Sequence, residues 1–289
     1  MSEPPAVVRR ARAKLNVFLR VLASREDGYH DLESLVVPLS LGDDVAASRA
    51  PRLRVEVAAA PGFTEVIPSG GLNLALVAAL ALAEACEVDD GAEIRIEKRI
   101  PVAGGLGGGS ADAAATLSAL NELWACGLNR DGLAAIGARV GSDVPAALAP
   151  GSVLMSGRGD VLEDVELPRS WWVVVPMAFG VRAPDAYRWW DEGDRRHGPD
   201  ARELLQAARA GDAALLGPLL FNDLEPPVFE RHAPLGQMKR RLLDLGALGA
   251  VMSGSGSSIA GLARDEEHAA ELARYVDGAV VAWGPAAER

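Results

Sequence analysis

A cluster of glycines that runs directly into a predicted helix constrains this chain more than any other stretch. Between Pro101 and Thr116 the sequence reads PVAGGLGGGSADAAAT. Residues 92–100 alternate isoleucines with charged residues, which predicts a half-buried strand, and the apolar residues after Gly109 recur at helical spacing. A glycine loop between a strand and a helix leaves backbone N–H groups free, and the helix dipole adds positive potential there. The stretch therefore predicts an anion-binding loop, with phosphate as the expected ligand.

Two common phosphate-binding motifs do not fit this loop. A Walker A motif ends in Gly-Lys-Ser/Thr, whereas Gly109 is followed by Ser110 and Ala111. The dinucleotide motif G-x-G-x-x-G, begun at Gly105, would need a glycine at position 110. A flexible glycine linker is the remaining alternative, and the flanking strand and helix argue against it.

The composition limits the kind of ligand and the compartment. The 289 residues carry a net charge of −11, which argues against nonspecific binding to nucleic acid or to an anionic membrane. The two cysteines, Cys86 and Cys126, have no metal-ligand spacing and indicate reduced thiols in the cytoplasm. We expect no signal peptide. The apolar residues 72–86 include Asn73 and Glu84 and predict a buried helix, capped by Asn73, rather than a membrane span.

Two N-terminal segments carry polar residues that could line a cleft. Residues 7–21 alternate like a strand, so that Lys14 and Asn16 would share one face. An edge strand protected by charge explains the same pattern equally well. In the predicted turn at 25–31, Tyr29 and His30 could stack on and hydrogen-bond a planar ligand, or could belong to a packed loop.

Asp143, in the segment GSDVP, also has two interpretations. An aspartate at a helix start most often caps the helix, and that is the favoured reading for this residue alone. The alternative is a general base beside the phosphate loop. The preceding short helix is expected to be capped by Asp131 and to end near Gly141.

The rest of the chain predicts two α/β parts. We expect a strand at 35–41, a turn at 42–44 and a strand at 52–57, and a domain boundary that divides residues 1–157 from 158–289. The second part should contain a strand, helices, two strands, a helix and a strand, which is the order of a ferredoxin-like layer. Its predicted elements are a strand at 171–175, a loop through 184–190, helices at 201–210 and 235–245, strands at 250–253 and 258–262, a helix at 265–275 and a strand at 279–283.

A second cluster of small residues, SGSGSS at 253–258, lies between two of these strands. It predicts either a tight hairpin turn or a second set of N–H donors at the cleft. Neither Ser255 nor Ser257 has the glycine two residues earlier that a serine-hydrolase elbow requires. The four histidines include no i,i+4 pair, so a zinc site has no support.

Taken together, the segments at 13–16, 101–112 and 253–256 resemble the three motifs of the GHMP small-molecule kinases. The segment AKLNVFL at 13–19, the turn DGYH at 27–30, the long glycine loop and GSDVP at 141–145 are similar to the members that act on a cytidine-linked methylerythritol. The resemblance runs along essentially the whole chain. It implies a two-domain α/β (α+β) fold, with an ATP-binding N-terminal domain similar to ribosomal protein S5 domain 2 and a ferredoxin-like C-terminal domain.

The resemblance also implies an activity. The γ-phosphate of ATP would be transferred to the C2 hydroxyl of 4-diphosphocytidyl-2-C-methyl-D-erythritol in the non-mevalonate isoprenoid pathway, with Mg²⁺ as cofactor and Ser110 as its candidate ligand. Lys14 and Asp143 match the catalytic pair, Asn16 a substrate-orienting position, and Tyr29, His30 and Tyr187 the cytidine site, with Trp189 and Trp190 as alternatives to Tyr187. The positions that match the ATP site are Asn73, Lys98, Pro101, Val102, Ala103, Gly104, Gly105, Leu106, Gly107, Gly108, Gly109, Ser110 and Ala111.

Several points stay open from the sequence alone. The third motif reads SGSGS instead of a form that ends in proline, and the second metal-binding acid of some relatives has no counterpart. A homoserine- or mevalonate-type kinase is disfavoured by the turn at 27–30, because those substrates have no base to stack on. A non-catalytic nucleotide-binding protein is disfavoured by the presence of both Lys14 and Asp143. The sequence is compatible with a monomer or a homodimer.

Overall fold

A seven-stranded sheet organises the first half of the computed structural model, which describes residues 6–60, 73–102, 104–193 and 198–286. Its strands follow the order β3-β4-β2-β1-β8, and a hairpin of β5 and β6 is attached to β2. The strands are β1 (Val7–Ser24), β2 (His30–Arg49), β3 (Arg54–Ala59), β4 (Ala92–Lys98), β5 (Ser152–Ser156), β6 (Val161–Val165) and β8 (Phe221–Asn222).

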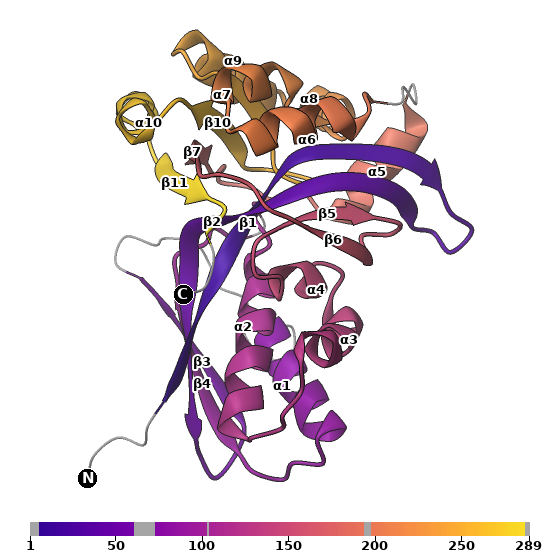
Figure 1. The fold of residues 1–289 in the computed structure, drawn as a ribbon, viewed down its shortest axis with the longest axis vertical. Helices are drawn as coiled ribbons and strands as arrows, with labels where there is room; N and C mark the ends of the chain where they lie inside the picture. The colour runs from indigo at the N-terminus through magenta and orange to yellow at the C-terminus, as the bar shows by residue number, and fades with distance from the viewer. Residues whose placement is uncertain (1–5, 61–72, 103, 194–197, 287–289) are drawn as a thin grey trace.

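Four helices cover one face of this sheet (Figure 1). They are α1 (Leu74–Ala85), α2 (Gly108–Leu123), α3 (Arg130–Val140) and α4 (Val144–Ala147). Helix α2 packs on β1 and β2 through a face rich in alanine, and α1 packs on α2. The side chain of Asn73 accepts a hydrogen bond from Ala75 N at 2.9 Å, so the predicted cap of α1 is confirmed.

A second, four-stranded antiparallel sheet forms the core of the other half, in the order β11-β7-β10-β9. In chain order, helices separate β7 from β9, a tight loop separates β9 from β10, and one helix separates β10 from β11. This is the predicted ferredoxin-like arrangement. The strands are β7 (Ser170–Val175), β9 (Gly249–Met252), β10 (Ile259–Ala263) and β11 (Val280–Gly284), and the helices are α5 (Ala183–Glu192), α6 (Ala201–Ala210), α7 (Ala213–Leu216), η2 (Gly217–Leu219), α8 (Glu225–Arg231), α9 (Ala233–Asp244) and α10 (Glu266–Ala273).

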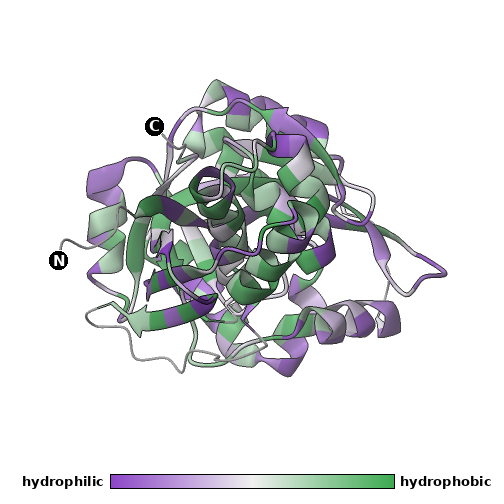
Figure 2. Cartoon of the chain, turned by 90° about the horizontal axis from the view of Figure 1, so that it is seen from below, coloured by the Kyte–Doolittle hydropathy of each residue, from purple (hydrophilic) through white to green (hydrophobic). Residues whose placement is uncertain are grey.

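The two halves share one hydrophobic core. Leu15 of β1, Leu117 of α2 and Trp172 of β7 are all fully buried in the same cluster. Figure 2 shows hydrophobic residues concentrated on the central strands and helices and hydrophilic residues on the outer helices. Within the described part of the chain, no helix has the length and apolar character needed to cross a membrane.

The predicted turn at residues 42–44 is wrong, because β2 continues through it. Asp43 is completely buried and accepts hydrogen bonds from the backbone N–H groups of Arg99 and Ile100, at 2.5 and 2.8 Å. A Gly-Asp-Asp triplet is typical of an exposed turn. Here the buried carboxylate of Asp43 instead accepts hydrogen bonds from the backbone that follows β4, more than fifty residues later in the chain. The β1–β2 pairing shifts register between Arg12 and Lys14, which accommodates the irregularity.

Two other local predictions are also corrected. The cap of α3 is Asn129, whose side chain accepts from Gly132 N at 2.9 Å, while Asp131 lies within the first turn. The predicted loop through 184–190 is wrong, because these residues lie entirely within helix α5, whose first turn accommodates Pro184 at a position where a missing N–H has no cost. The helix is stabilised by tertiary packing that the local sequence does not reveal, since Ala186 and Trp190 are buried.

The division of the chain at residue 157 remains a proposal. It falls in the turn between β5 and β6, and β6 pairs with β5 in the first sheet. Strand β8 also joins this sheet, next to β1. Residues beyond 157 therefore contribute to the first sheet as well as to the second.

Candidate active site

The glycine loop has the predicted geometry of a strand, a tight loop and a helix N-terminus. Gly107 precedes α2 with a φ of 68°, and Gly105 has a φ of 76°. Both values lie in the left-handed region that glycine adopts without strain. Helix α2 has no side-chain cap, so the N–H groups of its first turn are left for a ligand. The backbone N–H of Lys14 donates to Leu106 O at 2.9 Å and holds the loop against β1.

Most of the residues predicted to bind ATP line a single pocket beside this loop. Those that do are Asn73, Lys98, Pro101, Val102, Gly104, Gly105, Leu106, Gly107, Gly108, Gly109 and Ser110, joined by Val57, Leu74 and Asp112. Ala111 is buried and lines a cavity on the other side of α2. Ala103 lies outside the described residues.

Lys98 forms a buried cluster with two carboxylates. Its Nζ lies 2.5 Å from Asp43 Oδ2 and 2.8 Å from Asp112 Oδ2. Burial, reinforced by Asp43 and opposed by Lys98, raises the pKa of Asp112 to about 7. Because Asp43 also binds the backbone just before Pro101, the cluster fixes the start of the glycine loop to helix α2. Contact of Lys98 with adenosine stays a prediction.

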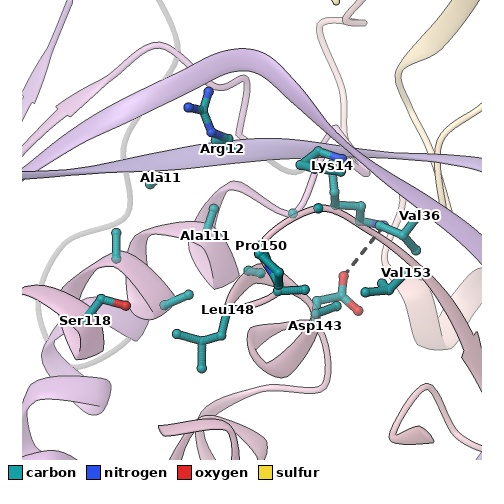
Figure 3. Close-up of a pocket in the computed structure, with 18 of the residues that line it drawn as sticks. Ala11, Arg12, Lys14, Val36, Ala111, Ser118, Asp143, Leu148, Pro150 and Val153 are labelled. Carbon is teal, nitrogen blue, oxygen red and sulfur yellow. Dashed lines mark ion pairs between the residues drawn. The ribbon is translucent and has the colours of Figure 1, made fainter. Parts of the chain in front are cut away.

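Asp143, at the start of α4, faces Lys14 of β1, and Lys14 Nζ lies 3.6 Å from Asp143 Oδ2 (Figure 3). Asp143 occupies the N-cap position of α4, but its side chain makes no capping hydrogen bond. The carboxylate is therefore directed to Lys14 instead of the helix backbone. The side chain of Asp143 is 38% exposed, which leaves it accessible to a substrate.

Lys14 is positioned by its neighbours on β1. Its Nζ donates to the side-chain oxygen of Asn16, and Asn16 Nδ2 donates to Ser34 Oγ at 2.8 Å. Strand β8 pairs with β1 only at Phe18 and Leu19, and at Lys14 the glycine loop lies along the edge of β1 instead, so the lysine faces a cleft and does not simply protect an exposed edge. Sharing a strand face thus places the lysine and the asparagine over the same cleft.

The second small-residue cluster is both a hairpin turn and a wall of the site. It connects β9 to β10, and Ser253 Oγ donates to Gly105 O at 2.9 Å while Ser258 N donates to Gly104 O at the same distance. Asn222 Nδ2 in turn donates to Met252 O and Gly254 O, at 2.7 and 2.8 Å. The C-terminal half thereby closes directly onto the phosphate loop.

The residues predicted to bind the phosphate-accepting substrate line a separate cleft beside Lys14 and Asp143, which we call the acceptor cleft. Its volume of ≈ 630 Å³ is in the range of small-molecule sites. The predicted residues that line it are Lys14, Asn16, Tyr29, His30, Asp143 and Tyr187. Gly105 and Gly107 line both this cleft and the glycine-loop pocket. The two sites therefore meet at Gly105 and Gly107, next to Lys14, whose side chain would lie 2.8 Å from a Cβ added at Gly107.

The aromatic residues of this cleft have distinct settings. Tyr187 stacks on His30 with ring centroids 4.8 Å apart, and Trp190 is buried with its ring edge-on to His30 at 5.8 Å. Trp189 instead packs on His232. Burial and the nearby Asp143 carboxylate raise the pKa of Tyr187, which keeps its hydroxyl protonated. Tyr29 is 56% exposed, with the Arg158 guanidinium 5.1 Å from its ring centre.

Sequence reasoning missed four polar residues of this cleft: Ser34, Arg158, Arg188 and Asp191. Arg158 stands between Gly157 and Gly159, both with positive φ, and a Gly-Arg-Gly turn could have marked it. Asp191 lies four residues after Tyr187, on the same face of α5, and helical spacing could have found it only if α5 had been predicted.

A third cavity, of ≈ 350 Å³, lies beside the Lys14–Asp143 pair, between β1, α2 and α4 (Figure 3). Small apolar side chains such as Ala111, Ala114 and Ala147 make up much of its wall. Lys14 and Asp143 line it as well, so a ligand placed there would contact this pair.

Comparison with known proteins agrees with this geometry. The family model described as the GHMP kinases N terminal domain matches residues 73–151, and the GHMP kinases C terminal model matches residues 204–282. The chain is 42% identical over 274 residues to a 4-diphosphocytidyl-2-C-methyl-D-erythritol kinase of Clavibacter michiganensis subsp. michiganensis, covering 91% of this chain and 88% of that protein. It is 42% identical over 272 residues to the kinase of that name from Pelotomaculum thermopropionicum, covering 92% of each.

Solved structures give the same result. A crystal structure of 4-(cytidine 5'-diphospho)-2C-methyl-D-erythritol kinase superposes with a TM-score of 0.81 and 35% identity, over 96% of this chain and 98% of that one. Homoserine kinase from Cytophaga hutchinsonii, at 19% identity and a TM-score of 0.73 over 100% of this chain and 97% of that one, shares the fold. The two family models and the relatives that match nearly the whole chain show that it belongs to the GHMP kinase family.

Proposed function

We propose that this protein transfers the γ-phosphate of ATP to the C2 hydroxyl of 4-diphosphocytidyl-2-C-methyl-D-erythritol, giving the 2-phosphate, in the non-mevalonate isoprenoid pathway. The observation that carries the proposal is the position of the Lys14–Asp143 pair where the glycine-loop pocket meets the cleft that contains Tyr29, His30 and Tyr187. The relatives that share about 40% of the sequence over nine-tenths of the chain bear that substrate in their names.

The residues of the site fit the requirements of phosphoryl transfer, which are positioning and charge stabilisation. The N–H groups of the glycine loop and the start of α2 would hold the phosphates of ATP. Asp143 would accept the proton of the attacking hydroxyl, and Lys14 would stabilise the negative charge that develops on the transferred group.

The donor set around the loop fits a magnesium ion carried by ATP. Mg²⁺ commonly binds through substrate phosphates and one or two protein oxygens, and it retains several waters. Among residues 6–60, 73–102, 104–193 and 198–286, no group of three acidic, histidine or cysteine side chains could hold the ion without the nucleotide. Ser110, in the first turn of α2, is the oxygen donor we expect beside the phosphates. The ion would neutralise phosphate charge during transfer.

The aromatic side chains of the acceptor cleft favour this substrate over those of other family members. Stacked and exposed aromatic rings beside a histidine suit a nucleobase, which homoserine and mevalonate lack. We expect the reaction to take place in the cytoplasm, with ATP and the cytidine-linked sugar alcohol as partners. The test is ATP-dependent phosphorylation of the cytidyl substrate, with homoserine and mevalonate as controls. Turnover of either control in preference to the cytidyl substrate would contradict the proposal.

Replacing Tyr29 with alanine should weaken the cytidyl substrate selectively. Stacking of a base on an aromatic ring contributes roughly 1–3 kcal/mol, so we expect KM for this substrate to rise about 5- to 150-fold. The KM for ATP should stay unchanged, because Tyr29 does not line the glycine-loop pocket. Steady-state kinetics with each substrate varied in turn measures both values.

Two further variants control for the Tyr29→Ala experiment. Tyr29→Phe keeps the ring and should retain most of the affinity. Tyr275→Ala removes a tyrosine of similar exposure, 58%, outside the cleft, and should have no effect on either KM. An equal rise of both KM values in Tyr29→Ala would exclude the stacking role.

A further inference from the structure

His30 is held in one orientation from several sides. Its side chain is only 8% exposed, its Nε2 lies 3.0 Å from Asp191 Oδ2, and its ring is packed between Tyr187 and the edge of Trp190. Asp191 is itself held, because Ser24 Oγ donates to its other oxygen at 2.7 Å. Together these contacts fix the orientation of the imidazole ring.

The carboxylate decides which ring nitrogen carries the proton. An ionised carboxylate has only acceptors, so the hydrogen bond between Asp191 and Nε2 requires that Nε2 be the donor. In the neutral imidazole the other nitrogen, Nδ1, then has the lone pair. In the described part of the chain no hydrogen bond reaches Nδ1, and His30 lines the acceptor cleft. With Nε2 donating to Asp191, Nδ1 is the one ring acceptor that His30 can offer to the cleft.

We propose that Asp191, through His30, sets the preference of the acceptor site for cytosine over uracil. Asp191 is a positioning residue here, and the inference rests on the function proposed above. Cytosine carries an amino group at C4, a donor that matches an acceptor at Nδ1. Uracil has a carbonyl oxygen at that place, so two acceptors would face each other. A site built to bond one group rejects an analogue that leaves buried polar atoms unpaired.

The variant that tests this is Asp191→Asn, which keeps the shape of the side chain but replaces one carboxylate oxygen with an NH₂ group that donates hydrogen bonds. Because Ser24 donates to one oxygen of the side chain, the new amide would turn its nitrogen toward His30 Nε2. That nitrogen then becomes the acceptor, and Nδ1 acquires the proton. The match with the cytosine amino group is lost, and a uracil carbonyl becomes the better partner.

We expect the ratio of kcat/KM for the cytidine substrate to that for its uridine counterpart to fall roughly 5- to 150-fold in Asp191→Asn, the effect of one or two buried polar mismatches. The assay is run in mildly alkaline solution, where imidazoles are neutral. The KM for ATP reports on folding and should not change. Nitrogen-15 NMR of the His30 ring should show a proton on Nε2 in the unmodified protein and on Nδ1 in the variant.

Glu192→Gln is the matched control, because Glu192 is the next residue on α5, pairs with Arg188 and Arg231, and does not line the cleft. It should leave the ratio unchanged. An unmodified protein that phosphorylates the cytidine substrate, together with a ratio unaltered by Asp191→Asn, would overturn the inference and leave the proposed function intact. Absence of turnover with the cytidine substrate in the unmodified protein would refute both.

Discussion

Asp143→Asn is expected to lower kcat roughly 10²- to 10⁴-fold, the contribution typical of a general base, while ATP still binds. The amide cannot accept the hydroxyl proton, and Lys14 loses the carboxylate that lies 3.6 Å from its ammonium group. ATP affinity should persist because Asp143 does not line the glycine-loop pocket. Single-turnover kinetics measures the chemical step, and calorimetry measures ATP binding.

The control for this experiment is Asp244→Asn, the same chemical change at an exposed position at the end of α9. It should retain full activity. A variant at Asp143 that turns over at the normal rate would refute the assignment of this carboxylate as the base. Loss of ATP binding together with turnover would point instead to a structural role for the loop before α4.

Gly105→Ala should disrupt the junction of the two halves as well as the phosphate loop. An added Cβ would lie 2.1 Å from Ser253 O, a backbone atom of the second half that cannot move aside on its own. The φ of 76° adds about 1–2 kcal/mol of strain for any residue with a side chain. Separating the loops would also misplace the phosphates, for which a loss of about 10²-fold in kcat/KM is expected. Thermal unfolding and kinetics report the two effects separately.

Gly127→Ala separates conformational strain from the steric clash. Gly127 has a similar φ, 70°, but an added Cβ there would have no neighbour within 4 Å among the described residues. This variant should lose about 1–2 kcal/mol of stability and keep its kcat/KM. If the two variants were equally active, the contact between Gly105 and the small-residue cluster at 253–258 would not matter for catalysis.

The strand, glycine loop and helix at 92–123 were predicted correctly because each signal there is local. Alternation, glycine and helical spacing act within a few residues, and α2 begins at Gly108, within two residues of the predicted start after Gly109. Errors arose where distant groups decided the structure. The triplet at 42–44 became part of β2 because Asp43 bonds to a backbone more than fifty residues away. Helix α5 was missed because its buried face packs on other elements of the second half.

The candidate site shows the same division. The residues proposed for the catalytic pair, the phosphate loop and the cytidine site were selected from motifs, and the structure brings them to two adjoining clefts. Asp191 was not identified, since a single aspartate in an unpredicted helix carries no signal until His30 lies 3.0 Å away. The choice between a helix cap and a free carboxylate at Asp143 likewise required the position of Lys14.

The sequence by itself therefore determined which chemical groups are available: a glycine loop suited to phosphate, a lysine, an aspartate and an aromatic pair, in the order of a known kinase family. Only the tertiary structure decided how these groups meet. Lys14 and Asp143 are separated by more than 120 residues in the chain. The small-residue cluster at 253–258 belongs to the second half, and its Ser253 hydrogen-bonds to Gly105 of the glycine loop. Local periodicity specifies each element, but distances between elements follow from the shared core, which no short stretch of sequence encodes.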